Sequence, residues 1–182
     1  MNGFVFCTMT FLLLWHTRAF ENDLWRPCSL SNGTYYVRRL RTNLTWAQQG
    51  CQYTNSIHVR PHGAASFPVQ VVVTDTTGLR FKLKHAQRDQ FVSVHFETYT
   101  SEIVQSLRFT RQAPSLEFTA KCSTEPPKHA STNMQPIIIQ VGTAYVTFDK
   151  KTKRLELGKH PMQWTLDRPI QKAKVFLPLN HQ

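Results

Sequence analysis

Apolar and polar residues alternate with a period of two through most of the chain after residue 67. The clearest example is segment 79–84, where three apolar residues alternate with three cationic ones. Successive side chains of a β-strand point to opposite faces, so the apolar residues of this segment, Leu79 included, are expected to face a core. The pair Thr77-Gly78 provides a turn from segment 69–74, which predicts a β-hairpin.

The same alternation predicts further strands along the chain. They lie at 91–99, 101–110, 116–122, 136–148, 153–157 and 172–179. Residues 149–152 (DKKT) are predicted to form the turn of a second hairpin. A helix is the alternative for 101–107, and a short helix is a candidate at 43–51, with Gly50 near its end.

Short strands at roughly ten-residue spacing predict an all-β fold, an antiparallel β-sandwich. A small β-barrel or a β-rich α+β fold is the alternative. The sandwich would have an immunoglobulin-like architecture without that family's sequence pattern. Ala120 stands where the family has a tyrosine two residues before its second cysteine, and the separation of Cys28 from Cys122 is longer than usual in such domains.

Residues 1–19 have the features of a cleavable signal peptide. The apolar run at 4–15 has the length of a signal's hydrophobic region but is too short to span a bilayer, and Ala19 suits the last position before cleavage. We therefore expect secretion of one β-rich extracellular domain at 20–182, with no transmembrane segment. The polar, proline-containing loop at 123–135 is the one candidate for an internal boundary.

Loss of residues 1–19 would leave three cysteines, which cannot all pair within one chain. Cys122 shares the apolar side of its predicted strand, which favours an intrachain disulfide that includes it. Its partner is either Cys28 or Cys51. The cysteine left over is then a buried free thiol or a link to another chain, since exposed free thiols are uncommon outside the cell.

Two N-glycosylation acceptor sequences agree with export. They begin at Asn32 (NGT) and Asn43 (NLT), and neither is interrupted by proline. Because a glycan needs an exposed acceptor, both asparagines are expected at the surface.

The chain is strongly basic, with 22 lysine and arginine residues against 11 acidic ones. Removal of Arg18 with the signal would leave a net charge of 21 minus 11, or +10. Outside the cell such a surface meets heparan sulfate and other polyanions rather than nucleic acid. The candidate polyanion-binding residues are Arg38, Arg39, Arg41, Lys82, Lys84, Lys150, Lys151, Lys153 and Arg154.

Sequence motifs for catalysis or metal binding are absent. There is no Gly-x-Ser-x-Gly or His-Glu-x-x-His pattern and no phosphate-binding glycine loop. His58 and His62 are four residues apart, but Pro61 disfavours the helix that would place both on one face, so they are expected to be solvated loop residues. No catalytic residue, cofactor or metal is predicted.

These features together predict a binding protein rather than an enzyme. The expected function is an extracellular binding module for another protein, as a subunit of a receptor-binding or immune-modulating complex, with added attraction to sulfated glycans or anionic surfaces. The leftover cysteine could link the partner covalently. The alternatives are a small secreted hydrolase with an unrecognised site and a structural matrix component.

Overall fold

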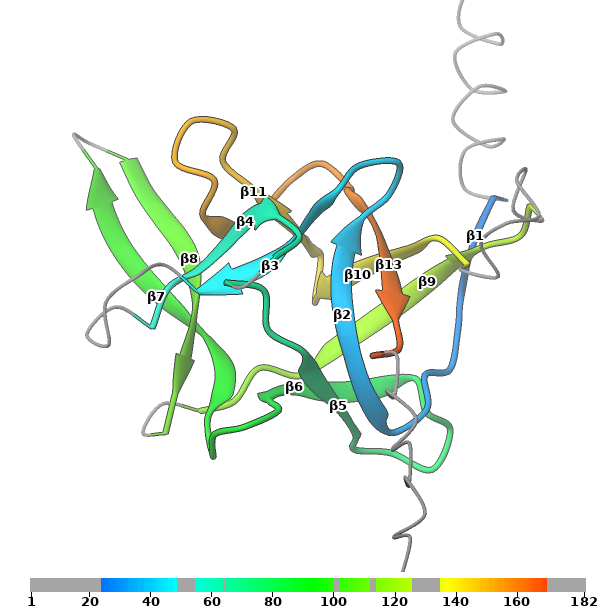
Figure 1. Cartoon of the computed structure of the whole chain (residues 1–182). Helices are drawn as coiled ribbons and strands as arrows, with labels where there is room; N and C mark the ends of the chain where they lie inside the picture. Colours follow the sequence, from blue (N-terminus) through cyan, green and yellow to red (C-terminus); the bar gives the residue numbers. More distant parts are fainter. Residues whose placement is uncertain are drawn as a thin grey trace, which may run out of the picture.

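The computed structural model describes residues 24–48, 55–63, 65–99, 102–111, 114–125 and 135–169. Within these residues the chain forms thirteen β-strands and no helix (Figure 1). The strands are β1 (Trp25–Pro27), β2 (Gly33–Arg39), β3 (Leu44–Gln48), β4 (Ile57–Pro61), β5 (Val69–Val73), β6 (Arg80–His85), β7 (Phe91–Tyr99), β8 (Glu102–Thr110), β9 (Phe118–Ser123), β10 (Ile137–Val141), β11 (Ala144–Phe148), β12 (Leu155–Gly158) and β13 (Gln163–Asp167). The proposed signal at 1–19, Cys51 and the predicted strand at 172–179 lie outside the described residues.

The period-two pattern correctly predicted β5 to β9. The helix suggested at 101–107 is wrong because its described residues, 102–107, belong to β8, and β3 occupies residues 44–48 of the helix suggested at 43–51. The single strand predicted at 136–148 is two strands, β10 and β11. Gly142 separates them with a φ of 57°, a conformation that glycine adopts without steric cost.

Pairing between the strands closes the sheet into a barrel. In the described part of the chain, nine strands form a ring in the order β10, β11, β12, β8, β7, β6, β5, β2, β13 and back to β10. Neighbours pair in antiparallel fashion throughout. The all-β antiparallel prediction is thus confirmed, whereas the sandwich is wrong and the alternative of a small barrel describes the fold. Alternation identifies which face of a strand is buried but not which strand pairs with which, and β13, which closes the ring, was not predicted.

Large aromatic side chains fill the core of the barrel. Trp46 and Trp164 are fully buried, and their rings meet edge to face with centroids 5.9 Å apart. The Trp164 Nε1 group donates a hydrogen bond to the Val146 carbonyl oxygen at 3.0 Å, which satisfies its buried polar atom. Phe81 is also buried as predicted, but Leu79 precedes β6 and is 36% exposed, so its expected core position is wrong.

A disulfide ties the first described strand to the barrel. Cys28 and Cys122 are joined with an S–S distance of 2.05 Å, which is one of the pairings that the sequence left open. The Cys28 amide also donates to the Ala120 carbonyl at 3.1 Å, directly after β1 pairs with β9. The link closes a long loop, because the two cysteines are 94 positions apart.

We predict that the double variant Cys28→Ala, Cys122→Ala is less stable than the native protein by about 4 kcal/mol, because the crosslink restricts the unfolded chain over a long loop. Denaturant unfolding measures this difference. Cys51→Ser is the control, which should leave stability within about 1 kcal/mol of native. A loss below about 1 kcal/mol in the double variant would show that the crosslink adds little to the fold.

Candidate polyanion-binding site

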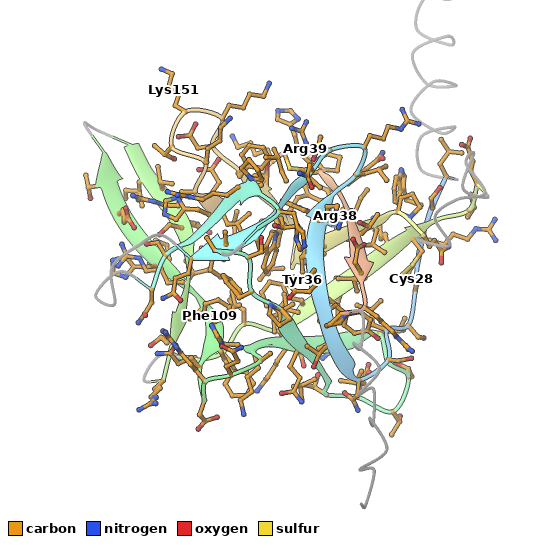
Figure 2. All side chains as sticks on the ribbon, in the orientation of Figure 1. Cys28, Tyr36, Arg38, Arg39, Phe109 and Lys151 are labelled. Carbon is orange, nitrogen blue, oxygen red and sulfur yellow. A yellow bond between two sulfur atoms is a disulfide. The ribbon has the colours of Figure 1, made fainter. Side chains whose placement is uncertain are left out.

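The predicted cations lie in two separate regions of the barrel. Lys82 and Lys84 are on β6, at the lower end of the molecule in Figure 1, whereas the β11–β12 turn lies at the upper end. Figure 2 shows Lys151 and Arg39 together at that upper end. The structure therefore does not bring β6 beside the β11–β12 turn, and the predicted cations do not form one continuous face.

Lys84 already has local partners. Its Nζ atom lies 2.9 Å from the Asp89 carboxylate and 5.6 Å from the centre of the Phe91 ring. These contacts engage its charge on the barrel wall. Lys82 is half-buried on the same strand. This region is therefore the weaker candidate for binding an external polyanion.

Arg38 and Arg154 are engaged in ion pairs within the protein. Arg38 Nε lies 3.0 Å from the Asp167 carboxylate, which is buried on β13. Arg154 donates to Glu97, and so does Arg108 from the neighbouring strand β8. Both predicted residues thus pair with carboxylates of the protein. Asp167 offsets the charge of Arg38, whereas Arg154 shares the single charge of Glu97 with Arg108.

Glu97 is the centre of this internal cluster. Burial alone would raise the pKa of Glu97, but hydrogen bonds from Ser106 and Arg108 and the charges of Arg154 and Arg108 outweigh burial and lower it. Ser106 Oγ donates to Glu97 at 2.8 Å and is fully buried. The structure thus places Glu97 in an ion cluster with Arg108 and Arg154, in which two cations keep one partly buried carboxylate ionised. The Glu97 carboxyl therefore lacks the raised pKa that would suit a general acid.

Phe148 brings two cationic turns together at the upper end of the barrel. Its ring lies 5.4 Å from the Arg39 guanidinium carbon and 5.7 Å from Lys153 Nζ. Arg39 ends β2, and Lys153 belongs to the turn between β11 and β12. We name this region the basic end and define it as Arg39, Arg41, Lys150, Lys151 and Lys153. All five come from the residues that the sequence proposed for polyanion binding.

Asp149 shapes the β11–β12 turn, which the sequence correctly predicted from residues 149–152. Its carboxylate accepts hydrogen bonds from the Lys151 amide at 3.0 Å and from the Thr152 amide and hydroxyl at 3.0 and 2.7 Å. The bonds from Thr152 and Lys151 lower the pKa of Asp149, so the carboxylate stays ionised and the turn stays folded. The lysines are held in a fixed loop while their side chains remain exposed.

Backbone conformation singles out the same two turns. Within the described residues, the non-glycine residues with positive φ are Arg41 at 58° and Lys153 at 59°. A side chain in this left-handed region costs roughly 1 kcal/mol, which glycine avoids. The chain carries a cation at both positions. Both residues lie in connections between paired antiparallel strands, where a residue with positive φ is a common part of the loop geometry.

An open groove of about 740 Å³ runs along β12 beside the turn. Lys151, Arg154 and Lys159 line it together with Asp149 and Glu156. Burial raises the pKa of Glu156, and the nearby Asp149 charge raises it further, against an opposing effect of Arg154. Because carboxylates lie among its cations, the groove is a less favourable place for a polyanion than the exposed turns beside it.

Both glycosylation acceptors are exposed. Asn43 lies in the β2–β3 turn with Arg41, so a glycan there would stand at the basic end. Asn32 Oδ1 accepts a hydrogen bond from the Val73 amide at 2.7 Å. This bond uses the amide oxygen and not the nitrogen to which a glycan would be attached.

His58 supports the turn from the neighbouring strand β4. It is 5% exposed, so its predicted place in a solvated loop is wrong, whereas His62 is exposed and packs edge to face on Tyr36 at 5.2 Å. His58 Nδ1 lies 3.4 Å from the Thr152 carbonyl oxygen, and the Val59 amide donates to the Lys153 carbonyl at 2.7 Å. The turn is therefore attached to the barrel along β4.

Phe148 and Asp149 organise the basic end, and sequence reasoning did not assign them that role. The signal for Asp149 was its place at the start of the predicted turn, where an aspartate commonly caps amides two and three residues on.

The described residues contain no group of three or more histidine, cysteine or carboxylate side chains that could hold a metal ion. Nor does this part of the chain include a helix long and apolar enough to cross a membrane.

Comparison with known proteins assigns no family. No protein-family model matches the sequence, and no curated protein matches it significantly.

We predict that Lys153→Gly is more stable than Lys153→Ala by about 1 kcal/mol, because alanine retains the cost of a positive φ. Comparing the two variants with each other cancels the loss of the lysine's contact with Phe148. Thermal or denaturant unfolding measures the difference. At Lys150, where no positive φ is found, the alanine variant should equal or exceed the glycine variant. If the glycine and alanine variants ranked in the same order of stability at Lys150 and at Lys153, a strained backbone at Lys153 would be contradicted.

We predict that the protein loses stability as the pH falls below 6.5, the ordinary pKa of histidine. Burial lowers the pKa of both His58 and His85, so the unfolded chain takes up protons before the folded one does. The contribution of the two neutral histidines to the free energy of unfolding is complete above pH 6.5. It is lost as the pH falls from 6.5 through their lowered pKa values in the folded protein. Urea unfolding on either side of this pH should show the loss, and His58→Gln should reduce it. Stability that rises on mild acidification would refute this assignment.

Proposed function

We propose that this chain is a secreted basic glycoprotein that binds another extracellular protein, and that its basic end attracts sulfated glycans. The observation that carries the proposal is the contact of Arg39 and Lys153 with Phe148, which holds cations of two distant turns on one surface. The exported state is inferred from residues 1–19 and from the acceptor sites at Asn32 and Asn43.

A sulfated glycan suits the basic end better than a single carboxylate would. Lys150 and Lys151 are exposed on one turn and Arg41 on the other, so the cations are spread over a surface rather than gathered in a pocket. A linear polyanion can contact such separated charges at once, and contacts of this type are weakened by salt. A hydrolase has less support, because the Glu97 cluster uses its carboxylate in internal ion pairs.

We predict that Arg39→Glu combined with Lys151→Glu lowers the salt concentration at which the protein elutes from a heparin column. Each reversal replaces attraction by repulsion, which is worth about 1 kcal/mol per contact in water. The charge-matched control is Lys82→Glu combined with Lys84→Glu, which should elute much closer to the native protein. An equal decrease in eluting salt concentration for the two double variants would show that net charge alone governs retention. Passage of the native protein through the column at low salt would reject glycan binding.

We further propose that the extracellular partner is linked through Cys51. The disulfide uses Cys28 and Cys122, so cleavage after residue 19 would leave Cys51 as the remaining cysteine. Electrophoresis of protein from its native source should show a heavier band that collapses on reduction and is absent from Cys51→Ser. A native protein that runs as monomer with a modifiable thiol would contradict a covalent partner.

A further inference from the structure

The β7–β8 hairpin forms an arm that reaches away from the rest of the barrel (Figure 1). Its two strands pair continuously from Phe91 opposite Thr110 to Tyr99 opposite Glu102. The pairing of β7 with β6 is confined to Phe91, which lies opposite Lys84. Beyond its first residues, β7 is therefore held in the sheet by β8 on one side.

The hydrogen bonds of β7 show which of its backbone groups face the edge that is not paired with β8. The Val92 carbonyl accepts a hydrogen bond at 3.0 Å from the amide of Leu116, which is outside the hairpin. Backbone groups of a strand alternate between its two edges, so Val94, Phe96 and Thr98 present their amides and carbonyls to the same outer edge. In the described part of the chain these groups have no backbone partner. The outer edge of β7 is thus an open template for another strand.

Apolar side chains lie beside this open edge. Phe96 is 65% exposed and Ile103 is 72% exposed. Phe96 is opposite Gln105, and Ile103 is opposite Thr98, so the two apolar side chains are diagonal neighbours on one face of the arm. A strand added to β7 would extend the sheet, and its alternate side chains would point the same way as Phe96 and pack beside it.

Charge decides which occupant fits best. The predicted mature chain has a net charge of +10, from 21 basic and 11 acidic residues, so two copies repel each other while an acidic protein is attracted. We propose that the outer edge of β7 binds an extended, acidic strand of a partner protein, whose apolar side chains pack beside Phe96. The inference rests on the proposed protein-binding function but uses a surface separate from the basic end.

The test uses a short synthetic peptide of alternating glutamate and valine, with blocked ends, titrated into the intact protein and followed by NMR. The peptide should shift the amide signals of Val94, Phe96 and Thr98 and slow their hydrogen exchange. A peptide with lysine in place of glutamate should bind about tenfold more weakly. No change at these amides up to millimolar peptide, or changes confined to the basic end, would overturn the proposal.

Variants separate strand addition from general attraction. Phe96→Ser combined with Ile103→Ser should weaken peptide binding about tenfold, because the apolar surface beside the added strand, formed by Phe96 with its diagonal neighbour Ile103, is lost. Leu79→Ser is the matched control, since Leu79 is exposed but lies outside the arm, and it should leave binding unchanged. Binding that survives the double variant would refute the assigned surface.

Thr98→Pro provides a second variant that keeps the hairpin intact. Proline removes an amide that faces the open edge and not β8, so it should abolish binding while circular dichroism remains native. Thr98→Val should bind normally. All arm variants should keep native retention on heparin, which separates failure of this inference from failure of the glycan site. Self-association of the protein through β7, measured by ultracentrifugation without peptide, would favour a second copy as the occupant and overturn the partner assigned here.

Discussion

The pairing of β13 with both β10 and β2 is the constraint on which the rest of the structure depends. It closes the ring of strands, and it places Trp164 opposite Ile137 on one side and Arg39 on the other. Trp164 is fully buried and contacts Trp46 and Phe148. Because Arg39 pairs directly with this core residue, closure of the barrel also fixes where the cationic end of β2 meets Phe148.

Two kinds of positive charge follow from this arrangement. Arg38 pairs with Asp167, and Arg108 and Arg154 both pair with Glu97, in the wall of the barrel. Removing Arg38 would leave the buried Asp167 carboxylate without this paired charge. Arg41 and the three lysines of the basic end instead remain exposed, although Arg41 and Lys153 occupy a costly backbone conformation, and Arg39 is half-buried beside Phe148. The arginines that pair with carboxylates of the barrel are therefore different from the cations that we propose to attract a polyanion. Sequence alone does not separate the two groups.

The strands that were predicted include ones with one buried and one solvated face, although β2 also alternates and was not predicted. β6 is such a strand, with buried Phe81 and Leu83 alternating with partly exposed cations. β3 and β13 were missed because neighbouring residues, such as Trp46 and Ala47, are buried in succession and no alternation remains. The turn at 149–152 could be predicted from its own residues, but its meeting with Arg39 depends on closure of the barrel.

We propose that the two turns of the basic end act as one binding surface, and NMR titration of the native protein with a short heparin oligosaccharide would test this proposal. The amide signals of residues 39–43 and 149–154 should shift together during the titration, with one common dissociation constant. Lys82 and Lys84 on β6 should not respond. Shifts in one turn alone, or larger shifts on β6, would contradict it.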